Sequence, residues 1–288
     1  MRRTRLRDHS INRLIPNILT LFALCAGLTS IKFALDANAL MNVTLSADES
    51  AVADAAARKW ELAVIAIIVA AVFDALDGRI ARLLDSTSKF GAELDSLSDF
   101  VAFGVAPAVV LYVWTMWTMD QTGRIGWGCA LLFSACMALR LARFNTKLDN
   151  ADVPAWTMRF FTGVPAPAGA GLVLLPLIAY NEYGAGFFNS PWLVGPWMVI
   201  VAGLLVSRIP TFSFKRLAIT QRWVLPAMVV VVVLVALLVS ETWHTMLGIG
   251  LLYLASIPFS HRQYQRLAVQ RPNAPTIDQR AEQDLDLP

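Results

Sequence analysis

The sequence predicts an all-α fold, a polytopic bundle of about eight transmembrane helices, and three observations carry this prediction. Apolar residues make up 57% of the chain, and charged residues make up only 16%. Several apolar stretches reach the roughly 20 residues that a helix needs to cross a bilayer. Lysines and arginines are concentrated in alternate connections between these stretches, as the positive-inside rule requires. A soluble domain with one large core does not explain this combination.

The apolar stretches define eight spans in order along the chain. They cover residues 16–35, 62–84, 95–117, 125–144, 163–180, 194–209, 223–239 and 243–258. A basic N-terminus at residues 1–15 therefore precedes a transmembrane domain at residues 16–261. The tail at residues 262–288 is polar and carries three prolines. It holds too little apolar surface to fold alone, so we expect it to be disordered.

The distribution of basic residues predicts the orientation of the bundle. Of the 24 lysines and arginines, 20 fall on the side of the spans that holds both chain ends. Both termini are therefore expected in the cytoplasm, with the protein in the cell (inner) membrane. An even number of spans requires the same arrangement. Because the basic residues are spread over many connections and form no single patch, we expect no nucleic-acid binding.

The first span has a competing interpretation. A basic start, an apolar stretch and the run Ala37-Asn38-Ala39 resemble a cleavable secretory signal. However, Asn17 and Thr20 put polar groups at the cytoplasmic end of the stretch, where a signal needs none. Cleavage would also leave seven spans and break the charge pattern.

Four aspartates mark the candidate active site. Asp74 and Asp77 lie three residues apart near the end of the second span, and Asp95 and Asp99 lie four apart in the third. Both spacings put a pair on one helix face, and the short connection lets the two faces meet. A charge at membrane depth costs about 2.5–3.5 kcal/mol, so a chain that keeps four has a use for them. Only twelve apolar residues precede Asp74 in its span, so we expect the carboxylates just below the cytoplasmic membrane surface.

These residue types predict metal-assisted chemistry on a phosphate. Four converging carboxylates repel one another, and a divalent cation bound by oxygen ligands, Mg²⁺ or Mn²⁺, relieves that repulsion. Gly78 lets a substrate approach the backbone, and Ala81 keeps the same helix face narrow. Arg82 offers a planar fork that binds phosphate through two hydrogen bonds. A metal, a phosphate-binding group and a spare carboxylate as base are the parts of a phosphoryl-type transfer.

The same residues carry a resemblance to a known family. The pattern Asp-x2-Asp-Gly-x2-Ala-Arg-x8-Gly-x3-Asp-x3-Asp runs complete from Asp74 to Asp99. With it, the chain resembles the CDP-alcohol phosphotransferases. Four further segments resemble their membrane phosphatidylserine synthase branch, at residues 103–108, 140–145, 161–168 and 207–211.

The resemblance implies a reaction and a set of site residues. A phosphatidyl group passes from CDP-diacylglycerol to the hydroxyl of L-serine, and CMP leaves. Asp74, Asp77 and Asp95 are implied metal ligands, and Asp99 is implied as the general base and a further candidate ligand. The implied CDP-diacylglycerol site comprises Asn17, Thr20, Gly78, Ala81 and Arg82. The family fold is a six-helix core, usually dimeric, and two added helices give eight spans.

The sequence leaves open which residues bind the acceptor and which class of function the protein has. Serine carries a carboxylate, so a guanidinium near the metal is expected, and Arg140, Arg143 and Arg208 are candidates to bind the acceptor or a phosphate. Simple membrane anchoring is the alternative role for each. A sibling transferase would use glycerol 3-phosphate, inositol or choline. A cation or proton transporter would also hold intramembrane acids, but it needs them near the bilayer midplane.

Overall fold

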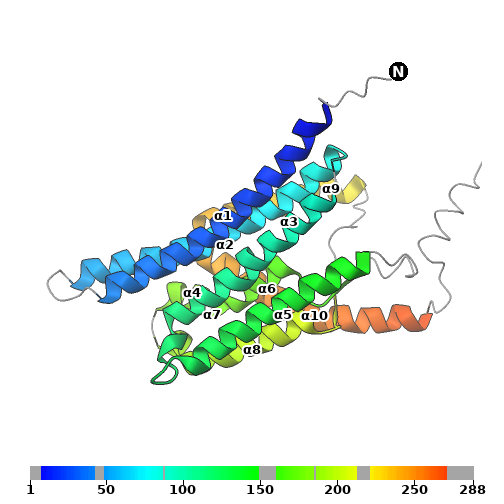
Figure 1. Cartoon of the computed structure of the whole chain (residues 1–288). Helices are drawn as coiled ribbons and strands as arrows, with labels where there is room; N and C mark the ends of the chain where they lie inside the picture. Colours follow the sequence, from blue (N-terminus) through cyan, green and yellow to red (C-terminus); the bar gives the residue numbers. More distant parts are fainter. Residues whose placement is uncertain are drawn as a thin grey trace, which may run out of the picture. The chain divides into compact units, whose positions relative to one another are not determined.

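The structure is a computed structural model that describes residues 8–42, 49–86, 88–148, 160–184, 186–212 and 221–270. Over these residues the chain is almost entirely helical, as predicted (Figure 1). It divides into two compact units. The first comprises Met1–Ala138 and Ala166–Ala202, and the second comprises Leu139–Pro165 and Gly203–Pro288.

The first unit contains most of the helices. They are α1 (Asp8–Asn42), α2 (Glu49–Leu83), α3 (Lys89–Asp99), η1 (Phe100–Val105), α4 (Ala106–Trp114), η2 (Met116–Thr118), α6 (Ala166–Val173), α7 (Leu175–Tyr183) and η4 (Phe187–Asn189). Two helices, α5 (Arg124–Leu148) and α8 (Pro191–Val206), begin in the first unit and end in the second. The second unit adds β1 (Phe160–Thr162), β2 (Pro210–Phe212), α9 (Gln221–Ser240) and α10 (Thr242–Gln270).

The long helices α1 and α2 lie side by side and pack through small residues (Figure 1). Small side chains let two helices approach closely, which is how helices associate where lipid removes the hydrophobic driving force. The Ser30 hydroxyl donates a hydrogen bond of 2.7 Å to the carbonyl oxygen of Ala63 across this contact. We call the contact the α1–α2 seam; its buried small residues are Thr20, Ala23, Ser30, Ala34 and Ala37 on α1 and Ala56, Ala63 and Ala70 on α2.

The third span is one continuous helical segment, Lys89–Trp114, with a π turn inside it. Within η1 the chain holds an extra residue per turn, so the Ala106 N–H donates to the carbonyl of Val101, five residues back. Pro107 follows directly, near the start of α4, where its missing N–H is tolerated. At the π turn the segment meets α1: a β-carbon built on Gly27 would lie 2.6 Å from the Ala102 Cα atom. The backbones of α1 and η1 are therefore in direct contact.

The helices agree with an all-α membrane protein, while the individual spans differ in detail from the prediction. Within the described residues, three helical segments are long and apolar enough to cross a membrane, at Leu14–Asn42, Lys89–Trp114 and Arg124–Thr146. Two shorter apolar helices occur there at Pro191–Val206 and Leu225–Ser240. In α2 the apolar stretch is only the twelve residues between Glu61 and Asp74. The span predicted at residues 163–180 is two helices, α6 and α7, interrupted at Leu174 just before Pro176.

The second unit contains a feature that the sequence analysis did not predict, a two-stranded antiparallel ribbon. Phe160 pairs with Phe212 and Thr162 with Pro210, and the ribbon continues through a bond from the Gly163 N–H to the Ile209 carbonyl. The strand β2 packs against α10. That helix continues to Gln270, so the first nine residues of the tail predicted to be disordered are helical. Residues 271–288 lie outside the described part of the chain.

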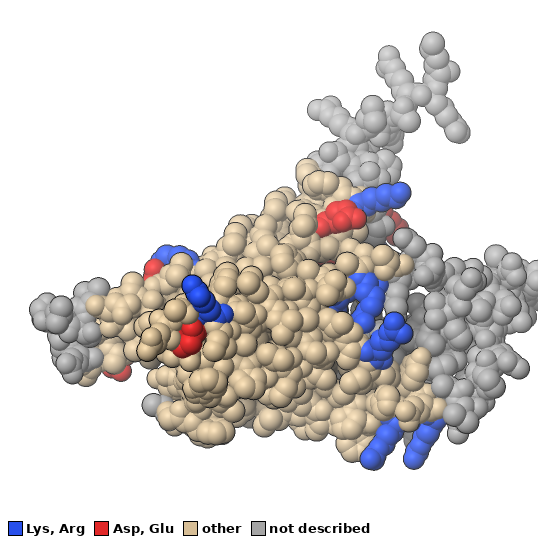
Figure 2. Space-filling model, turned by 60° about the horizontal axis from the view of Figure 1, so that its bottom comes forward, with Lys and Arg blue, Asp and Glu red and all other residues tan. Residues whose placement is uncertain are grey.

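Exposed apolar surface supports the membrane assignment. In α9, the large apolar side chains of residues 228–235 are all exposed, Val232 by 66%. Figure 2 shows a face on which uncharged residues cover most of the surface and Lys, Arg, Asp and Glu are few. In water such a surface would drive aggregation, whereas lipid covers it without cost.

The close approach of α1 to η1 predicts that Gly27→Ala destabilises the protein. The added methyl would collide with the Ala102 backbone, and overpacking of this kind costs about 1–3 kcal/mol. We expect a lower thermal unfolding midpoint in detergent. The matched control is Gly128→Ala on α5, where no atom lies within 4 Å of the added carbon, and its midpoint should be unchanged or slightly higher. Equal midpoints for the two variants would contradict the proposed contact.

Candidate active site

A tight connection joins α2 to α3, the two helices that carry the four aspartates. After α2 ends, Asp85 adopts the left-handed conformation, with φ 47°. The N–H of Ser86 donates to the Ala81 carbonyl at 3.0 Å, and the N–H of Asp85 donates to the backbone carbonyl of Arg82 at 3.4 Å. This pair of bonds is the Schellman motif that closes a helix C-terminus. On the far side, the Ser88 side chain accepts a hydrogen bond from the Gly91 N–H and caps the start of α3.

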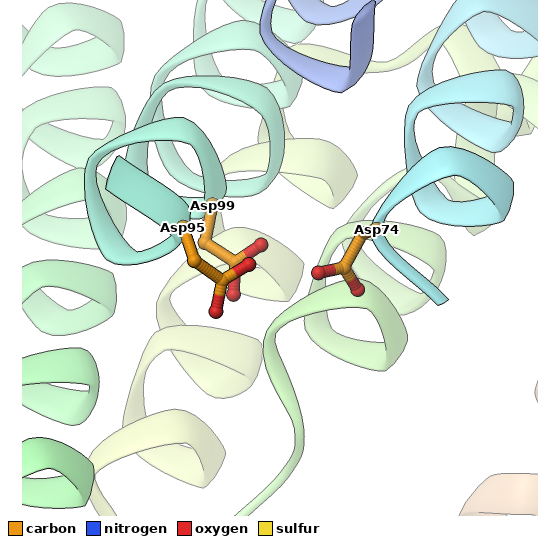
Figure 3. Close-up of side chains that lie close together, drawn as sticks. All are labelled: Asp74, Asp95 and Asp99. Atoms are coloured by element: carbon orange, nitrogen blue, oxygen red, sulfur yellow. The ribbon is translucent and has the colours of Figure 1, made fainter. Parts of the chain in front are cut away.

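Three of the four predicted carboxylates form one cluster (Figure 3). Asp95 and Asp99 extend from the α3 helix, and Asp74 faces them from α2. One oxygen from each of the three side chains lies within 4.8 Å of the others. All three side chains are partly buried. This is the spacing at which a single divalent cation can be shared by several carboxylates.

The fourth carboxylate, Asp77, lies outside this cluster. Its side chain is buried, and its Oδ2 atom accepts a hydrogen bond of 2.6 Å from the Thr20 hydroxyl of α1. The carbonyl oxygen of Thr20 in turn accepts a hydrogen bond from the buried Ser98 hydroxyl of α3. Thr20 therefore links all three helices that surround the acids.

A pocket adjoins the cluster and contains most of the residues predicted to bind CDP-diacylglycerol. Its volume is about 170 Å³. Asn17, Thr20, Gly78 and Ala81 lie on its wall, together with Asp77 and Asp95. A substrate in this pocket would therefore touch both the first and the second span while lying beside the carboxylates.

Arg82 is the one residue predicted for the CDP-diacylglycerol site that does not line this pocket, and two serines that line it were not predicted. Arg82 is exposed, does not line this pocket and donates from its Nε atom to the Gly78 carbonyl at 2.9 Å. Ser86 and Ser88 do line the pocket. A signal was available for Ser88, because a serine just before the first residue of a helix is typical of an N-cap.

The acceptor candidates Arg140, Arg143 and Arg208 belong to the second unit. The Arg143 guanidinium donates to the carbonyls of Leu205, Val206 and Ser207, at 3.3, 2.7 and 3.2 Å. These carbonyls end α8, so Arg143 acts as a side-chain cap of that helix. Arg140 donates from Nε to the Val164 carbonyl at 2.7 Å. The side chain of Arg208 is exposed.

The residues that gather here fit a divalent cation of the magnesium type. Every donor in the cluster is a carboxylate oxygen, which is the ligand type that Mg²⁺ and Mn²⁺ prefer. Thiol and imidazole groups, the preferred ligands of softer metals, do not contribute to it within the described residues. The adjoining pocket leaves room for a phosphate-bearing substrate next to the cation.

The fold and the site together define a class: a helical membrane protein with a carboxylate cluster beside a small pocket. Comparison with known proteins identifies it more closely. Residues 13–209 match the CDP-alcohol phosphatidyltransferase family, and residues 222–258 match the family CDP-alcohol phosphatidyltransferase 2. The chain belongs to the CDP-alcohol phosphatidyltransferase family.

Several curated relatives are similar over most of the chain, and each is named CDP-diacylglycerol–serine O-phosphatidyltransferase. The protein of Mycobacterium leprae (strain TN) is 38% identical over 256 residues, covering 89% of this chain and 77% of that relative. The Mycobacterium tuberculosis (strain H37Rv) protein is 35% identical over 260 residues, covering 90% and 82%. The Helicobacter pylori (strain 26695) protein is 35% identical over 190 residues, covering 65% and 75%.

The left-handed residue in the connection predicts opposite effects for two substitutions of Asp85. Asp85→Gly removes the β-carbon that this conformation disfavours, so stability should be kept or raised. Asp85→Val adds branching there and should lower the free energy of unfolding by about 1–2 kcal/mol. Thermal unfolding of the purified protein measures both. A valine variant as stable as the glycine variant would contradict the left-handed cap.

The cap on α8 predicts that Arg143→Ala is destabilising. Removing the guanidinium leaves three helix-end carbonyls without this donor, and the loss should be about 2 kcal/mol. Arg143→Lys should recover part of it, because a single ammonium cannot reach all three carbonyls. Unfolding midpoints test this. An alanine variant with unchanged stability but weakened serine binding would instead support a role in the acceptor pocket.

Proposed function

We propose that this protein transfers the phosphatidyl group of CDP-diacylglycerol to the hydroxyl of L-serine, giving phosphatidylserine and CMP. The observation that carries the proposal is the carboxylate cluster beside the pocket, in a chain that matches relatives named for this reaction over most of its length. The four aspartates and the glycine, alanine and arginine between them also have the spacing of the family pattern.

Each aspartate then has a proposed role. Asp74, Asp95 and Asp99 would hold Mg²⁺ or Mn²⁺, with Asp77, one turn after Asp74, as a further ligand. When bound, the ion supplies positive charge that offsets the charge of the substrate diphosphate. Asp99 is the proposed general base: it takes the proton of the serine hydroxyl as that oxygen bonds to the phosphorus attached to diacylglycerol. The bond from this phosphorus to the CMP oxygen breaks, and CMP leaves.

The pocket is the proposed site for the nucleotide end of CDP-diacylglycerol. Asn17 and Thr20 offer hydrogen-bonding groups, and Gly78 and Ala81 leave the wall of α2 open to the substrate. Arg82 lies one turn beyond Gly78, and a guanidinium there suits the diphosphate. The diacylglycerol chains would remain in the surrounding lipid.

The proposed setting is the cell membrane, with eight spans, both termini in the cytoplasm and the active site at the cytoplasmic face. The bias of basic residues toward one side supports this orientation. Residues 16–261 would form the catalytic domain, a six-helix core extended by α9 and α10. By analogy with the family, the enzyme is proposed to act as a homodimer.

Release of CMP from CDP-diacylglycerol by the detergent-purified protein tests the function. L-serine, glycerol 3-phosphate, inositol and choline are offered separately, with Mn²⁺ or Mg²⁺ present. We expect release with serine, and we expect a chelator to stop it until the metal is restored. Release with another alcohol would keep the reaction type and change the acceptor. No release from folded protein with any of them would overturn the proposal and reopen the transport alternative.

The proposed base predicts that the effects of two substitutions separate. Asp99→Asn should abolish transfer while keeping more of the Mn²⁺ binding than Asp95→Asn does, because both residues belong to the cluster but only Asp95 also lies on the pocket wall. Mn²⁺ binding is measured directly by electron paramagnetic resonance, and transfer by CMP release. Asp54→Asn, an exposed aspartate earlier on α2, is the matched control and should change neither. Equal loss of metal binding in both site variants would contradict this division of roles.

A further inference from the structure

The buried hydroxyl of Thr20 on α1 has two acceptors within reach. Its Oγ1 atom lies 2.6 Å from Asp77 Oδ2 and 3.1 Å from the Pro16 carbonyl, one turn earlier on the same helix. A helical threonine commonly bonds back to that carbonyl, as Thr29 does to Cys25 at 2.7 Å. A hydroxyl has one hydrogen to donate, and the shorter distance is typical of donation to a carboxylate. Thr20 therefore gives its hydrogen to Asp77, across the contact between α1 and α2.

This bond determines which oxygen of Asp77 a ligand can use. The Asp77 side chain is 5% exposed and lies on the pocket wall. The last side-chain torsion of an aspartate has broad wells, so a carboxylate held by nothing else turns easily. With Oδ2 bonded to Thr20, the carboxylate is fixed, and Oδ1 is left to face a cation or a water bound to it. A group that is already fixed loses less freedom when it binds.

The threonine is itself held in place from the other acid-bearing helix. The buried Ser98 hydroxyl on α3 donates to the Thr20 carbonyl at 3.0 Å. The next residue, Asp99, belongs to the carboxylate cluster (Figure 3). Thr20, Asp77 and Ser98 all lie in the first unit. Two hydrogen bonds therefore connect α3 through α1 to the fourth carboxylate on α2.

We infer that Thr20 is a positioning residue for the cation, acting through Asp77 and anchored by Ser98. This inference rests on the proposed function, in which Asp77 is a further ligand of Mg²⁺ or Mn²⁺. Partners that orient a metal ligand contribute to metal affinity without touching the metal. A residue that only contacts the nucleotide has no such effect in substrate-free protein. Thr20 therefore has a task besides lining the pocket, and it performs that task before any substrate binds.

The test is the affinity of the substrate-free, detergent-purified protein for Mn²⁺, measured by electron paramagnetic resonance. Thr20→Val keeps the shape of the side chain and removes the hydroxyl, and we expect it to raise the Kd about tenfold. Thr20→Ser keeps the hydroxyl and should restore the wild-type Kd. Thr29→Val is the matched control: it loses the same kind of bond within α1, from an exposed residue, and should leave the Kd unchanged. Unfolding midpoints, recorded alongside, show that each variant is folded.

The outcomes separate the inference from the function on which it rests. A folded Thr20→Val variant with the wild-type Kd would overturn the inference, as would a serine variant that binds Mn²⁺ as weakly as the valine variant. If Thr20→Val does not fold, Ser98→Ala takes its place: a raised Kd is expected, and an unchanged Kd overturns the inference. Wild-type protein that binds Mn²⁺ with the expected pattern but releases no CMP would overturn the proposed function alone. Wild-type protein that binds no Mn²⁺ would overturn both.

Discussion

Mutual repulsion among carboxylates is the constraint on which the rest of this structure depends. Asp74, Asp95 and Asp99 hold oxygens within 4.8 Å of one another, on two helices that follow each other in the chain. Like charges at that distance push their helices apart unless a cation or tight packing opposes them. The protein supplies the packing: the Schellman cap and the Ser88 cap fix the connection between the two acid-bearing helices. The caps thereby hold the three carboxylates close together, and a divalent cation would relieve the repulsion among them.

The first helix provides the other half of that packing. Because the buried side chains of α1 are small, α1 lies close enough for Thr20 to bond both Asp77 and, through its carbonyl, Ser98. A larger residue in the seam would widen the pocket and break these bonds together. The contact between α1 and α2 thus also holds Asp77 and the start of the third span in place around the pocket.

The sequence predicts which side chains share a helix face. It does not predict which residues distant in the chain they bond to. The three- and four-residue intervals placed each pair of aspartates on one face, and the short connection required the faces to meet. The bond between Asp77 and Thr20 joins residues 57 positions apart, which no periodicity reveals. The ribbon escaped prediction because three-residue strands carry no alternation to detect. The position of Arg143 depends in the same way on which helix-end carbonyls come to lie beside it.

The π turn at η1 sets a limit on how this chain can change in length. An α-helix turns about 100° per residue, so adding or deleting one residue normally rotates everything beyond it. Here Phe100–Val105 already holds one residue more than an α-helical turn would, between Asp99 and the buried helix α4. Deleting a residue from η1 would give an unbroken α-helix of good backbone geometry, yet the aspartates would then face away from Asp74. The π turn therefore keeps the acid-bearing face and the buried face of this span in register. Insertions and deletions in related chains are expected to fall outside Phe100–Val105.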